Sequence, residues 1–149
     1  MPWTPAQRNR LATEKRILER FFPGRVTWIE PTGDTKVEVL LNTNNGNKYC
    51  LRIYLKSEEE SSSDFPNSVP DMVVRSSPKP MPRWGVDGDK HTLGYRDDFL
   101  KICHYRTSRW TDRSTLYEVV MKGRFWLEAY EGYLKTGKCL SAFLGEMRA

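Results

Sequence analysis

The first apolar pattern along the chain is helical. The segment "TPAQ" at residues 4 to 7 has the form of a capping box with proline at the first helical position. Apolar residues then recur at helical spacing, and we expect the core to contain Leu11, Leu18, Phe21 and Phe22. The segment "FFPG" at residues 21 to 24 should end this helix, because proline and glycine both interrupt helical structure.

Short strand-like runs replace the helical pattern in the next part of the chain. They are "RVTWIE", "TKVEVLLN" and "KYCLRIYLK", at residues 25–30, 35–42 and 48–56, separated by the turn sequences "PTGD" and "NNGN". This arrangement predicts an antiparallel meander. We predict a three-residue loop with Gly46 in a left-handed conformation, which pairs apolar residues 41 with 51, 39 with 53 and 37 with 55. A fourth strand is predicted around residues 71–75.

The second half of the chain begins with less regular segments. Residues 57–64 are polar and serine-rich, and residues 78–98 contain too much proline, glycine and aspartate for regular structure. A loop as long as the second one is usually functional in a small domain. A long helix should follow, capped by Thr115 with Glu118 completing the capping box, and a short last helix should follow Gly137.

These elements predict one α+β domain spanning residues 1–149. Its parts would be an N-terminal helix, a four-stranded antiparallel meander sheet, a long loop that contains the candidate active site, and C-terminal helices. The aromatic residues of the long helix, Trp126, Tyr130 and Tyr133, are expected to pack in the core rather than line a ligand site.

Composition and charge narrow the class of protein. The 149 residues include 38% apolar and 29% charged residues, which is typical of a globular protein. The net charge of +5 permits nucleic-acid binding, but no helix-turn-helix, zinc-finger or RNP-like pattern accompanies it. Basic residues are densest in the first helix, where they form either a solvated face or a docking surface for an acidic partner.

The cysteines and the apolar runs bear on the compartment. Three widely spaced cysteines without CxxC spacing argue against a disulfide framework and against a closed zinc site. No segment approaches the roughly 18 apolar residues that span a bilayer. We therefore expect a protein of the reducing cytoplasm.

Cys103, within "FLKICHYRTSRW" at residues 99–110, is the candidate for chemistry, and it has three interpretations. The first is a buried packing residue, which we also predict for Cys50 and Cys139. The second is a phosphatase nucleophile, because Cys103 and Arg109 have C-x5-R spacing. The intervening "HYRTS" has no glycine to wrap an anion, which disfavours this interpretation. The third is a thioester-forming cysteine.

The third interpretation comes from a resemblance that begins upstream of the cysteine. The segment "FPNSVP" at residues 65–70 resembles the YPxxPP motif of ubiquitin-conjugating enzymes. In that family's order there follow His91, "IC" at residues 102–103, Trp110 and the helix capped at Thr115. The similarity covers nearly the whole chain in the same order of elements.

The resemblance implies a ubiquitin-conjugating-enzyme fold in which Cys103 carries an acyl group as a thioester. It assigns the motif histidine to His91 and the structural tryptophan to Trp110. Thr92 and Leu93 replace the proline and asparagine of the family's His-Pro-Asn motif. Such departures resemble divergent bacterial members found in ubiquitin-like conjugation and anti-phage defence operons.

The implied partners are an adenylating activating enzyme, a ubiquitin-like modifier or the C-terminus of a cyclic-nucleotide synthase, and a target protein whose amine accepts the acyl group. No metal or organic cofactor is implied, since ATP would be used by the activating enzyme. An alternative is a catalytically inactive relative that only binds a ubiquitin-like protein or a scaffold.

Thioester chemistry requires a thiolate and donors for the oxyanion. Four residues surround Cys103 in sequence and could favour the thiolate: Lys101, His104, Arg106 and Arg109. The oxyanion donor would be His91, Tyr95, His104 or a backbone amide, with His91 preferred because it holds the motif position. An equally open interpretation of His91 is a structural histidine that fixes the loop by hydrogen bonding. Asp97 or Asp98 is either a solvated loop carboxylate or the group that orients the incoming amine.

Overall fold

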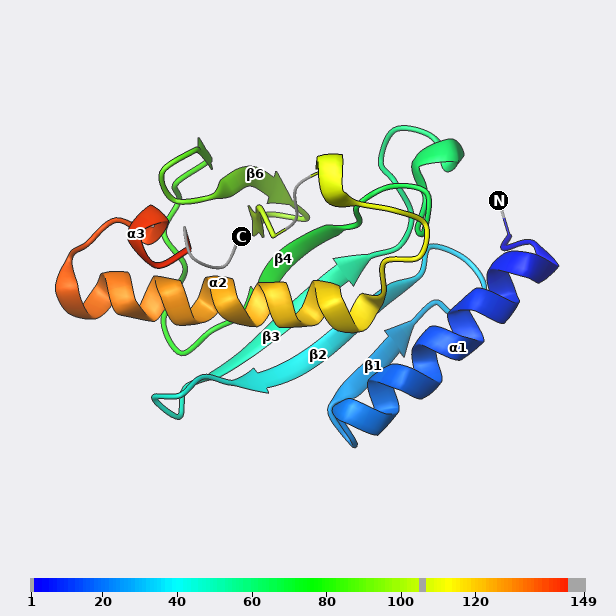
Figure 1. Ribbon diagram of the computed structural model, residues 1–149, viewed down its shortest axis with the longest axis horizontal. Coiled ribbons are helices and arrows are strands. Elements are labelled where there is room, and N and C mark those ends of the chain that lie inside the picture. The colour runs from blue at the N-terminus through cyan, green and yellow to red at the C-terminus, as the bar shows by residue number, and fades with distance from the viewer. Residues whose placement is uncertain (1, 105–106, 145–149) are drawn as a thin grey trace.

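A single antiparallel sheet organises the computed structural model, which describes residues 2–104 and 107–144. Seven strands lie in the order β1-β2-β3-β4-β7-β6-β5, and α2 crosses in front of the central strands while α1 lies beside β1 (Figure 1). The strands are β1 Val26–Ile29, β2 Lys36–Asn42, β3 Lys48–Tyr54, β4 Asp71–Ser76, β5 Val86–Asp87, β6 Thr92–Arg96 and β7 Phe99–Ile102. The helices are α1 Pro5–Phe21, α2 Leu116–Thr136 and α3 Leu140–Leu144, with short 3-10 turns at Ser61–Ser63 and Thr107–Arg109.

The first four strands form the predicted meander, but its register differs from the prediction. Val39 pairs with Leu51, whereas the prediction paired residue 39 with residue 53. The Thr43 amide donates to the Asn47 carbonyl at 2.9 Å, so the loop contains three residues and Gly46 is left-handed with φ 84°. The loop type was therefore correct and the pairing was wrong by two residues, which leaves each side chain on its predicted face.

The prediction that residues 78–98 lack regular structure is wrong, because β5 and β6 lie within them. Asp97 and Asp98 form the two-residue turn between β6 and β7, with φ 52° and 65°. Two successive left-handed residues match the right-handed twist of a hairpin, and aspartate tolerates that conformation better than most residues.

The fold class is accordingly a correction. The protein is α+β, but its sheet has seven strands rather than four, and β7 extends the meander by pairing with β4 through Val73 and Lys101. The ubiquitin-conjugating-enzyme fold implied by the resemblance is not matched. Cys103 directly follows a strand of the sheet, and most of the long loop expected before it is a β5–β6–β7 hairpin system.

Both predicted helix starts are confirmed. Thr4 and Gln7 form a complete capping box, with the Gln7 amide 3.2 Å from the Thr4 hydroxyl and the Thr4 amide 2.7 Å from the Gln7 side-chain oxygen. Thr115 caps α2 by accepting the Glu118 amide at 3.2 Å. Gly137 ends α2 in a left-handed conformation, and the short helix α3 follows as predicted.

A buried carboxylate joins α1 to α2. Glu14 is only 1% exposed and accepts the Leu116 amide at 2.9 Å, which adds a second cap to the start of α2. Arg10 pairs with Glu14 at 2.8 Å and donates to the carbonyl oxygens of Asp112 and Ser114. The segment between Cys103 and α2 is thereby fastened to α1.

The core lies between the sheet and the helices. Alternate residues of β2, β3, β4 and β7 face α2, whose buried residues include Val119, Val120, Trp126 and Leu127. Leu11 and Leu18 of α1 are buried as predicted, whereas Phe21 is 52% exposed and packs against Tyr117 on the surface. The prediction of Phe21 as a core residue is therefore wrong, and Phe22 is half-buried.

Candidate active site around Cys103

The hairpin of β6 and β7 sets the position of Cys103. Thr92 pairs with Ile102. Directly beyond this pair, the amide of Cys103, which follows β7, donates to the carbonyl of His91, which precedes β6, at 2.8 Å. The structure therefore brings together the two residues that the sequence selected as catalytic. The Cys103 side chain is half-buried, so the thiol lies at the surface end of β7 rather than inside the core.

His91 holds several segments together. Its backbone is left-handed, with φ 54°, and the residue is only 7% exposed. The His91 carbonyl also accepts the indole N–H of Trp126 at 3.2 Å, which connects the hairpin to α2. His91 Nε2 lies 3.2 Å from Ser141 Oγ in α3.

Ser141 connects the His91 ring to the 88–91 turn. The Ser141 hydroxyl lies 3.1 Å from the Asp89 carbonyl, to which it can donate, and 3.2 Å from His91 Nε2. The imidazole therefore joins α3 to the turn before β6, while the His91 carbonyl contacts the Cys103 amide.

The amide of Cys103 is occupied, which bears on the phosphatase interpretation. A phosphate-binding loop needs successive free amides directed at the anion. Here the first of them is bonded to His91, and Arg109 lies exposed in the 3-10 turn Thr107–Arg109. The geometry opposes a phosphatase site.

The cations predicted around Cys103 contribute less charge than the sequence suggested. Burial lowers the pKa of His104 to about 4, so its ring is neutral at pH 7, and Nδ1 lies 3.3 Å from the Ile102 carbonyl. Lys101 Nζ lies 3.6 Å from an Asp71 oxygen that Arg96 also contacts at 3.1 Å, so Lys101 shares this carboxylate with a second cation. Arg106 lies outside the described residues.

Trp110 connects the segment after Cys103 to the "FPNSVP" segment. Its indole N–H donates to the Pro66 carbonyl at 2.9 Å, and its ring meets that of Phe65 edge-on at 6.1 Å between centroids. Phe65 is buried at 1% exposure, with the Arg10 guanidinium 5.1 Å from its ring centroid. Two motifs on which the resemblance depends are thus packed together.

Asp97, Asp98 and Tyr95 lie away from Cys103. The two aspartates form the β6–β7 turn, at the opposite end of β7. Asp97 accepts the Tyr54 hydroxyl at 2.9 Å, and Asp98 pairs with Arg83 at 3.0 Å. The Tyr95 hydroxyl accepts the Gly85 amide at 2.9 Å. Asp98 and Tyr95 thus contact residues just before β5, and Asp97 connects the turn to the end of β3.

The other two cysteines differ from each other. Cys50 is buried as predicted, and burial, followed by the nearby Glu38 carboxylate, raises the pKa of its thiol to about 11. The prediction that Cys139 is buried is wrong: it is exposed, with Sγ 3.4 Å from the Asp89 carbonyl. Trp126 and Tyr130 are core residues as predicted, and Tyr133 packs against the core in a half-buried position.

Sequence reasoning missed Ser141 and Asp89, which hold His91 in place. Ser141 lies 50 residues after His91, and no local pattern indicated that contact. The tight turn "DD" within "YRDDFLKI" is a local signal that would have placed β6 and β7 and so brought His91 beside Cys103.

Within residues 2–104 and 107–144, no three His, Cys, Asp or Glu side chains are grouped so that they could hold a metal ion. In the same part of the chain, no helix combines the length and the apolar character needed to cross a bilayer. No protein-family model matches this chain, and neither a curated protein nor a solved structure matches it significantly.

Proposed function

We propose that this protein is a cysteine acyltransferase that carries an acyl group as a thioester on Cys103 and passes it to a target amine. The observation that carries the proposal is the placement of Cys103, whose backbone is fixed by His91 at the end of β7 while the residue is only half-buried. A nucleophile needs this combination of a fixed main chain and access for the substrate.

The chemistry consists of two exchanges without oxidation or reduction. The Cys103 thiolate attacks the carbonyl carbon of a thioester on the activating enzyme, the new C–S bond forms, and the donor sulfur leaves as a thiolate. An amine nitrogen then attacks the same carbonyl carbon, the amide bond forms, Cys103 leaves as a thiolate, and the amine proton passes to solvent. ATP is consumed by the activating enzyme, so this chain needs no cofactor.

His91 is a positioning residue in this proposal. Its carbonyl bonds to the Cys103 amide and to the Trp126 indole, and its ring bonds to Ser141. These three contacts hold the loop beside the thiol at two sides, because they bond it to the helices α2 and α3 and to the end of β7. Loss of the His91 ring should therefore slow transfer without abolishing thioester formation.

The wider setting follows from the order of motifs shared with ubiquitin-conjugating enzymes. The protein would act in the bacterial cytoplasm, in anti-phage defence, with an adenylating activating enzyme as donor. The acyl group would be the C-terminus of a ubiquitin-like modifier or of a cyclic-nucleotide synthase. The packing of Trp110 on the "FPNSVP" segment supports this setting, because it unites two of those motifs.

The experiment is a non-reducing pull-down from cells that carry the native neighbouring genes, followed by intact mass with and without added thiol. Wild type, Cys103→Ala and the matched control Cys139→Ala are compared, because Cys139 is an exposed thiol outside the proposed chemistry. We expect a thiol-labile adduct on wild type and on Cys139→Ala that is absent from Cys103→Ala. The mass of the adduct would identify the modifier.

A non-catalytic binding module is the second candidate, and the charge around Cys103 favours it. His104 is neutral at pH 7 and therefore adds no positive charge beside the thiol, and the Lys101 ammonium is directed at the Asp71 carboxylate. If partners bind wild type and Cys103→Ala equally, and no adduct forms with active donor enzyme and ATP present, the acyltransferase proposal fails and the binding module replaces it.

A further inference from the structure

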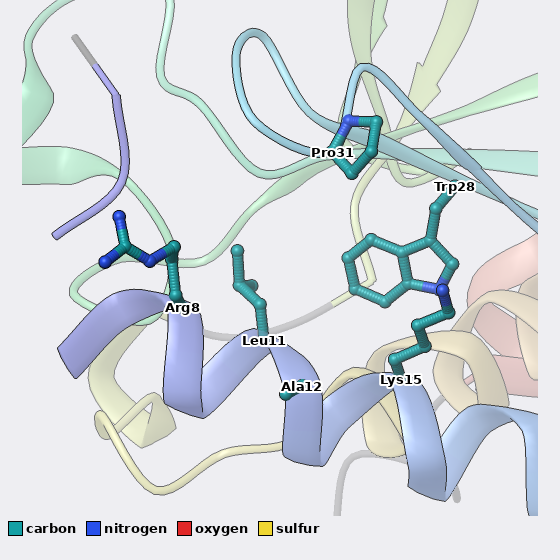
Figure 2. A pocket seen from close by; sticks show the side chains of 6 residues that line it. All are labelled: Arg8, Leu11, Ala12, Lys15, Trp28 and Pro31. Carbon is teal, nitrogen blue, oxygen red and sulfur yellow. The ribbon is translucent and has the colours of Figure 1, made fainter. Parts of the chain in front are cut away.

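A groove runs between α1 and the end of β1, the edge strand of the sheet (Figure 2). It encloses about 200 Å³ and is lined by Arg8, Leu11, Ala12, Lys15, Trp28 and Pro31. The four α1 residues lie three or four positions apart, so they share one face of the helix. Trp28 and Pro31 form the opposite wall.

The groove combines an apolar floor with cations at two positions. Leu11 and Ala12 face Trp28 and Pro31 across it, and Arg8 lies near one end. Figure 2 shows the Lys15 side chain rising from α1 toward the nitrogen-bearing edge of the Trp28 ring. Such a surface suits a ligand that carries both an apolar group and a negative charge.

The donors at this groove lack acceptors. Trp28 Nε1 is buried and has no hydrogen-bond partner within the described residues. A buried donor without an acceptor costs about 1–3 kcal/mol, so an acceptor supplied from outside would remove a penalty as well as add a bond. The indole N–H can only donate, and so can the Lys15 ammonium directed at the same place.

The two cations at the groove differ from Arg10 in their ion pairing. In the part of the chain that the structure describes, neither Arg8 nor Lys15 forms a salt bridge, and the Arg8 guanidinium contacts only the Trp3 carbonyl, at 3.3 Å. Arg10, on the same helix, is by contrast paired with Glu14 at 2.8 Å. The uncompensated charge of α1 is therefore partly concentrated at the groove.

We propose that this groove binds a short acidic segment of a partner protein, in which a carboxylate lies next to an apolar side chain. The carboxylate accepts from Trp28 Nε1 and pairs with Lys15, while the apolar side chain covers Leu11 and Pro31 and a second acidic group faces Arg8. A peptide fits better than a nucleic acid, because the groove offers two cations around an apolar floor rather than a row of phosphate contacts. This inference does not depend on the chemistry of Cys103.

The indole N–H of Trp28 is itself the reporter for the test. In a ¹⁵N-labelled sample the Trp28→Phe variant assigns its resonance among the five tryptophans. The probe is a capped octapeptide of alternating glutamate and leucine, and its control is the same peptide with glutamine in place of glutamate. We expect the glutamate peptide to move the Trp28 indole proton downfield to saturation, and the glutamine peptide to bind at least about tenfold more weakly.

Charge variants separate a specific groove from general attraction to a basic helix. Lys15→Gln and Arg8→Gln should each weaken binding of the glutamate peptide by about fivefold. Arg16→Gln is the matched control, since it removes the same charge from an exposed position of α1 outside the groove. It should change the affinity by less than about twofold.

Several outcomes would overturn the proposal. One is an unchanged Trp28 resonance at millimolar peptide, and another is an equal loss of affinity in Arg16→Gln. Equal binding of the glutamine peptide would show that the groove binds apolar side chains without recognising the carboxylate. A single-stranded oligonucleotide that moved the same resonance at lower concentration would assign the groove to nucleic acid instead. Dispersed amide spectra of each variant establish that it is folded.

Discussion

The carboxylate of Glu131 fastens the β2–β3 turn to α2, and replacing it with glutamine tests how the sheet and the helix are held together. Glu131 is 5% exposed. Its Oε1 accepts from Asn45 Nδ2 at 2.9 Å, and its Oε2 accepts from Asn47 Nδ2 at 2.7 Å and from the Tyr49 hydroxyl at 2.8 Å. Three donors, two from the β2–β3 turn and one from the start of β3, therefore converge on one carboxylate.

The cost of Glu131→Gln follows from this geometry. The amide oxygen of glutamine can keep the two donors at Oε2, but those bonds lose the assistance of charge, about 0.5–1 kcal/mol each. The new NH₂ group faces Asn45, whose exposed side-chain amide can turn to present its oxygen, so this contact adds little cost. We expect a loss of about 1–2 kcal/mol, which lowers Tm by roughly 2–8 °C in a chain of this size.

The effect should depend on pH. Burial acts to raise the pKa of Glu131, but the hydrogen bonds from the turn outweigh it and the pKa lies below the usual 4.5 of a glutamate. A depressed pKa means that the stabilisation is complete above the unfolded pKa and is lost as pH falls through the folded pKa. The stability difference between wild type and Glu131→Gln should therefore be full at pH 7 and should narrow below about pH 4.5.

Urea unfolding followed by far-UV circular dichroism at pH 7 and at pH 3.5 measures both quantities. Glu19→Gln is the matched control, because it removes one carboxylate from an exposed position of α1. The reasoning is refuted if Glu131→Gln is no less stable than Glu19→Gln at pH 7. A stability difference that stays constant with pH would refute the assigned pKa direction.

Three further predictions concern single side chains. Iodoacetamide should alkylate Cys50 at least about 100-fold more slowly than a free cysteine of pKa about 8.5, because its thiol has a pKa of about 11 and is buried; peptide mass spectrometry measures the rate, and a rate within tenfold of the free thiol would contradict this. Gly123→Ala should be less stable than Gly132→Ala by about 1–3 kcal/mol. A Cβ at position 123 would lie 2.6 Å from side-chain atoms of the buried Leu51 and Met72, whereas a Cβ at position 132 would meet only the Phe143 ring, at 2.9 Å. Both variants gain the same helix propensity. Equal urea midpoints would therefore contradict this prediction, because they would show that Leu51 and Met72 can move aside without cost. Trp110→Phe should cost about 1 kcal/mol and speed amide exchange around residues 65–70, because it removes the 2.9 Å bond to the Pro66 carbonyl; unchanged exchange would show that this bond does not hold the segment.

Local signals in the sequence were enough to place most elements. Thr4 and Thr115 begin helices because their side chains accept amides that a helix leaves unpaired. Gly46 sets the β2–β3 loop because it adopts a left-handed conformation at no steric cost. The alternation of apolar residues assigned the correct faces to β2 and β3, although pairing was displaced by two residues, because apolar alternation is unchanged by a shift of two.

The hairpins between residues 85 and 102 were missed because their composition resembles that of a loop. Asp97 and Asp98 were interpreted as solvated or catalytic carboxylates, whereas their backbone makes the β6–β7 turn. This difference changed the fold from a four-stranded sheet to a seven-stranded one and removed the basis for the fold that the resemblance implied.

The sequence by itself determined the helix starts and the first four strands, because each depends on preferences that act over a few residues, whereas the choice of Cys103 as the residue for chemistry stays a prediction. Only the tertiary structure decided that His91 holds the Cys103 amide and that Glu14 caps a helix 102 residues away. It also placed Trp28 beside Lys15, with an indole N–H that has no hydrogen-bond partner among the described residues. Contacts of this kind depend on the path of the whole chain, and burial strengthens them. Patterns that extend over a few residues therefore do not predict them.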